Sequence, residues 1–112
     1  MKQTLVIGST VADVIVNVPT IPSTGEDVNV VSQHIQLGGC AYNVAHILTL
    51  TKTPHMLCSP VGSGVYGDFV AAELKSFGIP CFVRLDVPNG CCYCVVEACG
   101  ERSFMSYHGA EY

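Results

Sequence analysis

The segment Gly38-Gly39-Cys40-Ala41-Tyr42-Asn43 is the part of this sequence best suited to bind a small polar ligand. Two glycines let a ligand approach the backbone closely and permit φ angles that other residues avoid. A helix is expected to begin at Cys40 or Ala41, and the free N–H groups of its first turn would be donors for ligand oxygens. Asn43 would lie within that turn, where its side chain can both donate and accept hydrogen bonds. The pattern indicates a site for a hydroxyl-rich ligand, with a glycine hinge beside an exposed asparagine as the structural alternative.

A single carboxylate, Asp13, lies in the otherwise apolar stretch from Thr10 to Val18. Its burial without a partner would be costly, so it either faces water at a sheet edge or is held at a binding site. In open α/β sheets ligands bind beyond the carboxyl ends of strands, and Asp13 closely follows the apolar run at residues 5–7. Asp13 is therefore a candidate binding residue.

Residues 61–67 form a second glycine-rich segment, Val-Gly-Ser-Gly-Val-Tyr-Gly. It lacks the Gly-Lys-Ser/Thr ending of a phosphate-binding loop and has no dinucleotide-binding spacing. A structural loop is the favoured interpretation. Asp68, which follows it, is expected in the first turn of a helix, where a negative charge favours the helix dipole.

The chain has seven cysteines, four of which lie close together as Cys91, Cys92, Cys94 and Cys99. Their spacing does not match that of zinc-binding knuckles. We expect thiols that fill a strand core and no metal site, with a metal- or redox-responsive cluster as the alternative.

Composition narrows the functional class. The 112 residues are 49% hydrophobic and only 12% charged, which indicates a folded chain whose surface is covered by more chain or by a second subunit. With five Lys and Arg and a net charge of −4, nucleic-acid binding is not expected. The sequence contains neither a membrane-spanning run nor a secretory signal pattern, so the cytoplasm is the expected location.

The predicted elements are those of an α/β fold with an added β-sheet flap. Strands are expected at residues 5–7, 14–18, 28–31, 35–37, 56–61, 81–87, 91–97 and 102–107. A first helix, ended by Pro54, would bury one face made of Ala41, Val44, Ala45 and Leu48. A second helix at about 65–77 would be capped by Gly78 in the left-handed conformation.

Together these segments resemble the N-terminal half of PfkB-family (ribokinase-like) carbohydrate kinases, over essentially the whole chain. Residues 8–13 resemble the family's first strand and its sugar-contacting acid, and residues 38–45 match its N-terminal signature, closed by Gly62. Residues 61–67 resemble a Val-Gly-x-Asp-x-x-Gly stretch with Gly64 in place of the Asp. Residues 100–104 resemble the hairpin of the family's β-sheet lid, and Lys52 departs from the usual small residue.

The resemblance implies a ribokinase-like α/β fold, with the N-terminal part of the central sheet, flanking helices and a small lid from about 14–37 and 81–107. It implies ATP-dependent phosphorylation of a sugar hydroxyl. Asp13, Gly38, Gly39 and Asn43 would bind the sugar, and Val11, where some relatives have a polar contact, disfavours ribose. The lid's inner face would carry alternate strand residues, namely Cys92, Cys94, Phe104 and Ser106. Arg102 is expected to be an exposed hairpin residue.

The family's catalytic aspartate, anion hole and ATP site lie in its C-terminal half, and none of those motifs occurs in these 112 residues. ATP and Mg²⁺ are therefore expected only for the full-length enzyme, and this chain is expected to be inactive alone. A homodimer through the lid is also expected by resemblance. A non-catalytic sugar-binding or dimerisation module is the alternative function.

Overall fold

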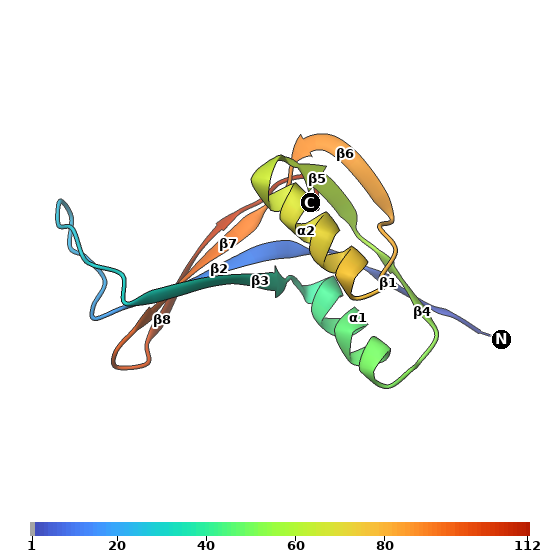
Figure 1. The fold of residues 1–112 in the computed structure, drawn as a ribbon, viewed down its shortest axis with the longest axis horizontal. Coiled ribbons are helices and arrows are strands. Elements are labelled where there is room, and N and C mark those ends of the chain that lie inside the picture. Colours follow the sequence, from blue (N-terminus) through green and yellow to red (C-terminus); the bar gives the residue numbers. More distant parts are fainter. Residues whose placement is uncertain (1) are drawn as a thin grey trace.

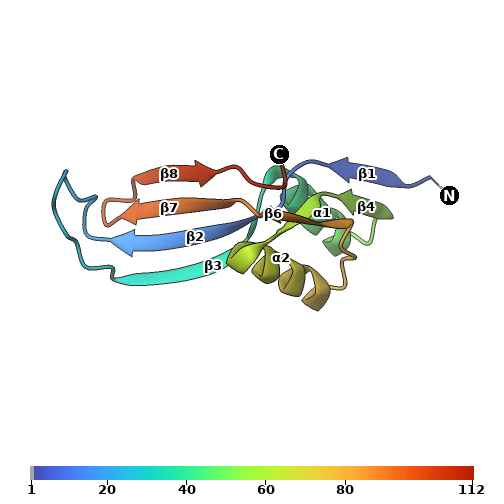
Figure 2. The same ribbon diagram turned by 90° about the horizontal axis from the view of Figure 1, so that it is seen from above.

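Two sets of strands build the structure, a computed structural model that describes residues 2–112 (Figure 1). One set lies with two helices in a core, and the other forms a four-stranded sheet that projects from the core. The projecting sheet gives the molecule its elongated outline, with extents of 55 × 32 × 21 Å (Figure 2).

The core contains four short strands that pair in parallel. β1 (Thr4–Ile7) pairs with β4 (His55–Cys58), and β5 (Pro60–Ser63) pairs with β6 (Val83–Pro88). Only Ser59 separates β4 from β5, so one extended segment pairs with β1 through its first half and with β6 through its second half. Parallel strands of this kind are normally covered on both faces.

Two helices pack on these strands. α1 (Cys40–Leu50) begins where the sequence predicts, and α2 is Gly64–Ser76. The apolar core that they form with the strands is made of Val6, Leu37, Ala41, Tyr42, Ala45, Leu57, Val61, Val70, Leu74 and Ile79. This burial removes apolar surface from water, the dominant favourable term in folding.

The buried face of α1 differs from the predicted one. Ala41 and Ala45 are buried as expected, but Val44 is 51% exposed and Tyr42 is buried in its place. The helix is thus turned so that its tyrosine faces the core. Periodicity identifies a helix reliably, but it leaves the direction of the buried face to whichever large side chain finds space.

The end of α2 is the predicted left-handed cap. Gly78 has φ 72°. The Ile79 amide donates to the Leu74 carbonyl at 2.9 Å, and the Gly78 amide donates to the Lys75 carbonyl at 3.0 Å. These bonds satisfy carbonyls that the end of a helix otherwise leaves without partners.

The projecting sheet, named the lid sheet, has the strand order β3-β2-β7-β8. Its strands are β2 (Val11–Val18), β3 (Ser32–Gly38), β7 (Cys91–Glu97) and β8 (Arg102–Tyr107). β2 pairs antiparallel with β3 and parallel with β7, and β7 pairs antiparallel with β8. A contact of 3.2 Å between the Tyr66 and Tyr93 hydroxyls joins α2 to this sheet.

Three predictions about strands were wrong. Residues 28–31 form no strand, and β3 alone returns to the core. Gly62 and Ser63 are the last residues of β5 and do not form a loop, and α2 begins at the next residue, Gly64. The lid range of about 81–107 is too long: β6 pairs with β5 in the core, so the second half of the lid sheet begins at Cys91.

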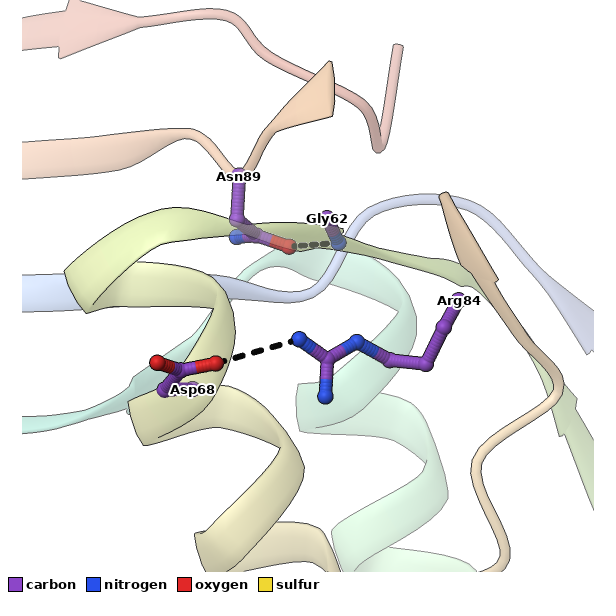
Figure 3. Close-up of polar contacts among 4 residues, drawn as sticks. All are labelled: Gly62, Asp68, Arg84 and Asn89. Atoms are coloured by element: carbon purple, nitrogen blue, oxygen red, sulfur yellow. Dashed lines mark hydrogen bonds and ion pairs between the residues drawn. The ribbon is translucent and has the colours of Figure 1, made fainter. Parts of the chain in front are cut away.

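Asp68 also lies elsewhere than predicted. It follows the first turn of α2, and its Oδ1 lies 3.2 Å from Nη2 of Arg84 on β6 (Figure 3). Both side chains are largely exposed, so this ion pair adds little stability.

No helix within residues 2–112 has the length and apolar character needed to cross a membrane.

Candidate functional site

A cavity of about 230 Å³ lies at the root of the lid sheet, where β2 and β7 begin and α1 starts. It is lined by Ser9, Val11, Asp13, Gly39, Cys40, Cys91, Cys92, Ser106, Tyr107, His108 and Tyr112. Two of the predicted sugar-binding residues, Asp13 and Gly39, therefore share one cavity. Concave sites with a few convergent polar groups are typical of small-molecule binding.

Asp13 supplies the carboxylate of this cavity. The side chain is half-buried, and no hydrogen bond to it is formed by any residue from 2 to 112. Burial raises the pKa of the Asp13 carboxyl above its ordinary value, because desolvation disfavours the charged form. A carboxylate that has lost water without gaining a donor is well suited to accept hydrogen bonds from a ligand.

Gly38 is required by the position of that carboxylate. A Cβ atom at Gly38 would lie 2.1 Å from Asp13 Oδ2 and 2.6 Å from Asp13 Oδ1. The φ of Gly38 is not in the left-handed region, so space alone explains this glycine. Gly38 contributes to the site by leaving room for Asp13.

Gly39 has a different constraint. Its φ of 98° is in the region that favours glycine, and a Cβ atom there would lie 2.5 Å from the Ser9 carbonyl oxygen. The chain can therefore turn from β3 into α1 while it lies against the β1–β2 connection. This close approach places the start of α1 beside the strand that carries Asp13.

Two first-turn amides of α1 are already used, contrary to the expectation that these amides would be free for a ligand. The Ala41 and Tyr42 amides donate to the Ser9 carbonyl, at 3.2 and 3.4 Å. The Ser9 carbonyl thus caps this helix, a role that a side chain commonly has at a helix N-terminus. The sequence pattern could not reveal that residue 9, far away in the chain, supplies this acceptor.

Asn43 does not line the cavity of Asp13 and Gly39. It lines a neighbouring, more open hollow of about 350 Å³ together with Ile35, Gln36, Leu37, Tyr42, His46, Glu73 and Phe77. Gln36 is the strand partner of Asp13, so the two hollows adjoin across β3. Burial and the nearby Glu73 raise the pKa of the Tyr42 hydroxyl.

The four predicted lid residues share one face of the sheet. Cys92 is paired with Ser106 and Cys94 with Phe104, and the register places Asp13 opposite Cys92. Cys92 and Ser106 line the cavity, whereas Cys94 is buried and Phe104 is 61% exposed nearer the lid tip. Of the four residues predicted for the inner lid face, the two nearest the core therefore line the cavity.

Other residues of the cavity wall were missed. Cys40 begins α1, and hydrogen bonds with the backbone and hydroxyl of Ser9 lower the pKa of its thiol. His108 and Tyr112 stack with their ring centroids 3.9 Å apart. Cys40 could have been found because it lies within the glycine-rich segment, but nothing in the local sequence marks the residues after β8.

All seven cysteines are free thiols, and no group of three or more His, Cys, Asp or Glu within residues 2–112 has the geometry to hold a metal ion. The glycines of residues 61–67 are not a phosphate cradle either. A Cβ atom at Gly62 would lie 2.4 Å from the Val87 carbonyl, and one at Gly67 would lie 2.1 Å from the Gly62 carbonyl. These glycines allow strand and helix to pack closely.

The helices and strands are arranged as in the ribokinase-like α/β fold. The chain matches the pfkB family of carbohydrate kinases over residues 1–111. It therefore belongs to this family, as the sequence predicts.

Relatives agree with this assignment. The chain is 32% identical over 111 residues to the uncharacterized sugar kinase YegV of Escherichia coli K12, covering 98% of this chain and 35% of that protein. The ribokinase of Giardia lamblia has a TM-score of 0.87 and 25% identity, over 98% of this chain and 37% of the other. The ribokinase of Cryptococcus neoformans in complex with ADP has a TM-score of 0.81 and 25% identity, over 100% and 36%. The chain thus spans little more than a third of the length of these relatives.

The steric role of Gly38 gives a first prediction, for a double-mutant cycle. Gly38→Ala should destabilise the protein by about 1–3 kcal/mol, because the added methyl group overlaps the Asp13 carboxylate. In an Asp13→Ala background most of this cost should disappear, giving a coupling of about 0.5–3 kcal/mol in urea unfolding. Gly39→Ala is the matched control: its clash is with the Ser9 backbone, so Asp13→Ala should not rescue it. Equal costs of Gly38→Ala in both backgrounds would contradict this account.

The raised pKa of Asp13 gives a second prediction, for stability against pH. The folded protein binds this proton more tightly than the unfolded chain, so the wild type loses stability as pH rises from the ordinary value of 3.8 through the raised value. Asp13→Asn should remove that loss. The melting temperatures of the two proteins should nearly agree at about pH 3 and diverge in favour of Asp13→Asn towards neutral pH. A constant difference across this range would show that burial does not raise the pKa of Asp13.

Proposed function

We propose that this chain is the sugar-binding part of an ATP-dependent sugar kinase. The observation that carries the proposal is the half-buried Asp13 carboxylate, which faces a cavity beside Gly39 and has no partner from residues 2–112. Membership of the carbohydrate kinase family gives the reaction class, which is phosphoryl transfer to a sugar hydroxyl.

The chemistry of the cavity favours a neutral sugar. Asp13 accepts hydrogen bonds from ligand hydroxyls, and those bonds replace the water that the carboxylate has lost. The cavity wall formed by residues 2–112 contains no Lys or Arg. A carboxylate or phosphate on the ligand would be repelled by Asp13, whereas a hydroxyl donor is complementary to it.

Three other residues belong to the proposed sugar site. Gly38 leaves room for the carboxylate, and Gly39 brings the backbone of α1 to the ligand. Asn43 is retained as a proposed sugar ligand because it lies in the first turn of the helix whose start lines the cavity. Its amide would reach a part of the sugar that extends towards the adjoining hollow.

The lid sheet serves to exclude water from the reaction. Cys92 and Ser106 line the cavity on the same sheet face as Asp13. A cover of this kind favours transfer of the phosphoryl group to the sugar over transfer to water.

ATP, Mg²⁺ and the catalytic base are assigned to residues outside this chain. Relatives are almost three times as long, and residues 2–112 contain no group of three or more His, Cys, Asp or Glu placed to hold a metal ion. The outer face of the core also keeps large apolar side chains at the surface, among them Leu5 at 57% and Ile7 at 76% exposure. A further layer of chain over β1 would cover them.

Seven free thiols suit the reducing cytoplasm, where we place the enzyme.

The proposal predicts turnover by the full-length polypeptide that contains these residues. It should release ADP with one or more neutral sugars in a panel of pentoses, hexoses, sugar acids and nucleosides. The 112-residue chain alone should give none. Asp13→Asn, which keeps the shape of the side chain and removes its charge, should lower kcat/KM by about 10²-fold or more.

Asp68→Asn is the matched control for that assay, because it removes an exposed carboxylate on α2 that lies outside the cavity. Its kcat/KM should equal that of the wild type. Full activity of Asp13→Asn, or turnover by the 112-residue chain, would contradict the proposal.

We also infer that the lid sheet forms a homodimer contact. Its two faces both expose large apolar side chains, with Phe104 at 61% and Met105 at 63% exposure on opposite faces of β8. Exposed apolar patches of this kind are typical of interaction surfaces.

A dimeric binding module without catalysis is the second candidate function, and it would show dimerisation and sugar binding but no ADP release.

Sedimentation tests the dimer. The protein should sediment as a dimer, and either Phe104→Glu or Met105→Glu should convert it to a monomer, according to which sheet face is covered. Lys75→Glu, an exposed change on α2, should leave the dimer intact. A monomeric wild type at micromolar concentration would overturn the inference.

A further inference from the structure

One buried side-chain amide, that of Asn89, joins segments that are far apart in the sequence. Asn89 is 1% exposed. Its Oδ1 accepts a hydrogen bond from the Gly62 amide at 2.9 Å, as Figure 3 shows. Its Nδ2 donates to the Thr10 carbonyl at 3.3 Å and to the Gly90 carbonyl at 3.0 Å. The amide group therefore uses both its acceptor and its donor capacity inside the protein.

These partners lie where the lid sheet leaves the core. Thr10 immediately precedes β2, Gly90 immediately precedes β7, and Gly62 lies in β5 of the core. Because β2 and β7 are the two central strands of the lid sheet, Asn89 links the roots of both to the core. The β5–β6 pairing ends just before Asn89 and the β2–β7 pairing begins just after it, so the three bonds tie the one pair of strands to the other.

The contacts of Asn89 with Gly62, Thr10 and Gly90 form a junction between the core and the lid sheet. The buried carboxylate of Glu111 also belongs to this junction, because it binds the Gly90 amide. Glu111 is 6% exposed, and its Oε1 accepts from the Gly90 amide at 2.6 Å while its Oε2 accepts from the Gly109 amide at 3.0 Å. A Cβ atom at Gly90 would lie 2.0 Å from Glu111 Oε2. Both backbone groups of Gly90 are thus held by side chains, one by Asn89 and one by Glu111.

The junction lies next in sequence to the walls of the sugar cavity. Thr10 is flanked by Ser9 and Val11, which both line the cavity, and the Ser9 carbonyl also holds the first turn of α1. Gly90 is followed by Cys91 and Cys92, and Gly109 is preceded by His108, all of them cavity residues. A shift of the junction would therefore move several walls of the cavity at once.

We propose that Asn89 is a positioning residue for the sugar site, with Glu111 as its counterpart across Gly90. This inference rests on the proposed sugar-binding function. The pair holds the roots of β2 and β7 at one angle to the core, so that Asp13, Gly39 and the inner lid face are presented together. Neither side chain contacts the ligand.

Asn89→Asp is the sharpest test variant because it keeps the shape of the side chain. The Oδ1 acceptor for Gly62 remains, but the donor to the Thr10 and Gly90 carbonyls is replaced by an oxygen. An ionised oxygen facing two carbonyl oxygens is repulsive, so the root of the lid sheet must move. Misplacement of a site by about 1 Å can cost about 10²-fold in rate, even from a distance.

The control variant is Leu74→Ala, which opens the core under α2 without touching the junction. In the full-length polypeptide, Asn89→Asp should raise the KM for the best neutral sugar of the panel by about tenfold or more, with the KM for ATP unchanged. Leu74→Ala should lower the melting temperature at least as much and leave both KM values unchanged. If the two variants lose stability alike and neither changes the sugar KM, the positioning role is wrong.

A second readout does not depend on turnover. In spectra of isotope-labelled protein, Asn89→Asp should shift the amide signals of Asp13, Gly39 and Cys40, while the Ile79 amide at the far end of α2 stays in place. Unshifted signals at those three residues would overturn the inference. Shifted signals in a protein that phosphorylates no sugar would support the junction and reject the proposed function, so the two failures are distinguishable.

Should Asn89→Asp fail to fold, Asn89→Ser supplies the third variant. Its hydroxyl can serve one of the three partners but cannot span all of them, so the same three amides should shift by less. Unchanged signals in Asn89→Ser would overturn the proposal equally well.

Discussion

Space for a carboxylate between β2 and the end of β3 is the constraint on which the site depends. Any side chain at residue 38 would overlap Asp13, and any side chain at residue 39 would overlap the Ser9 carbonyl. The two glycines thus let β2, β3 and the start of α1 approach one another until the Asp13 carboxylate loses much of its water. The approach costs stability, because the charged form of Asp13 is disfavoured there. A ligand whose hydroxyls donate to the carboxylate would recover that cost on binding.

Two different kinds of contact hold the two parts of the molecule. The core is apolar, with Val61, Val70 and Leu74 completely or almost completely buried. The junction between the core and the lid sheet is polar, because strands that begin or end there leave backbone amides and carbonyls without strand partners. Asn89 and Glu111 supply those partners. Hydrogen bonds are directional where apolar contacts are not, so the polar junction can fix the angle at which the lid sheet leaves the core.

The sequence allowed the local features to be predicted, because their causes are local. The start of α1 after the paired glycines and the Gly78 cap each follow from residues a few positions away, although the atoms that require those glycines belong to Asp13 and Ser9, far away in the chain. The features that were missed depend on segments far apart in the chain. The Ser9 carbonyl that accepts from two α1 amides is one such feature, and the pairing of β6 with β5 is another. Neither spacing nor periodicity carries information about which distant segment supplies a hydrogen-bond partner.

The chemistry of the cavity wall suggests how such a site can select its ligand. Three of the lining residues, Cys40, Cys91 and Cys92, are cysteines, whose thiols pack as small apolar groups and form only weak hydrogen bonds. Strong polar recognition in this part of the site is therefore concentrated on Asp13, with the hydroxyls of Ser9 and Ser106 beside it. A ligand that turns one hydroxyl-bearing edge towards Asp13 can place its carbon skeleton against the thiols without leaving polar groups unsatisfied. In the proposed function, discrimination between sugars would follow from shape at the thiol wall, while the carboxylate would fix the orientation of whichever sugar fits.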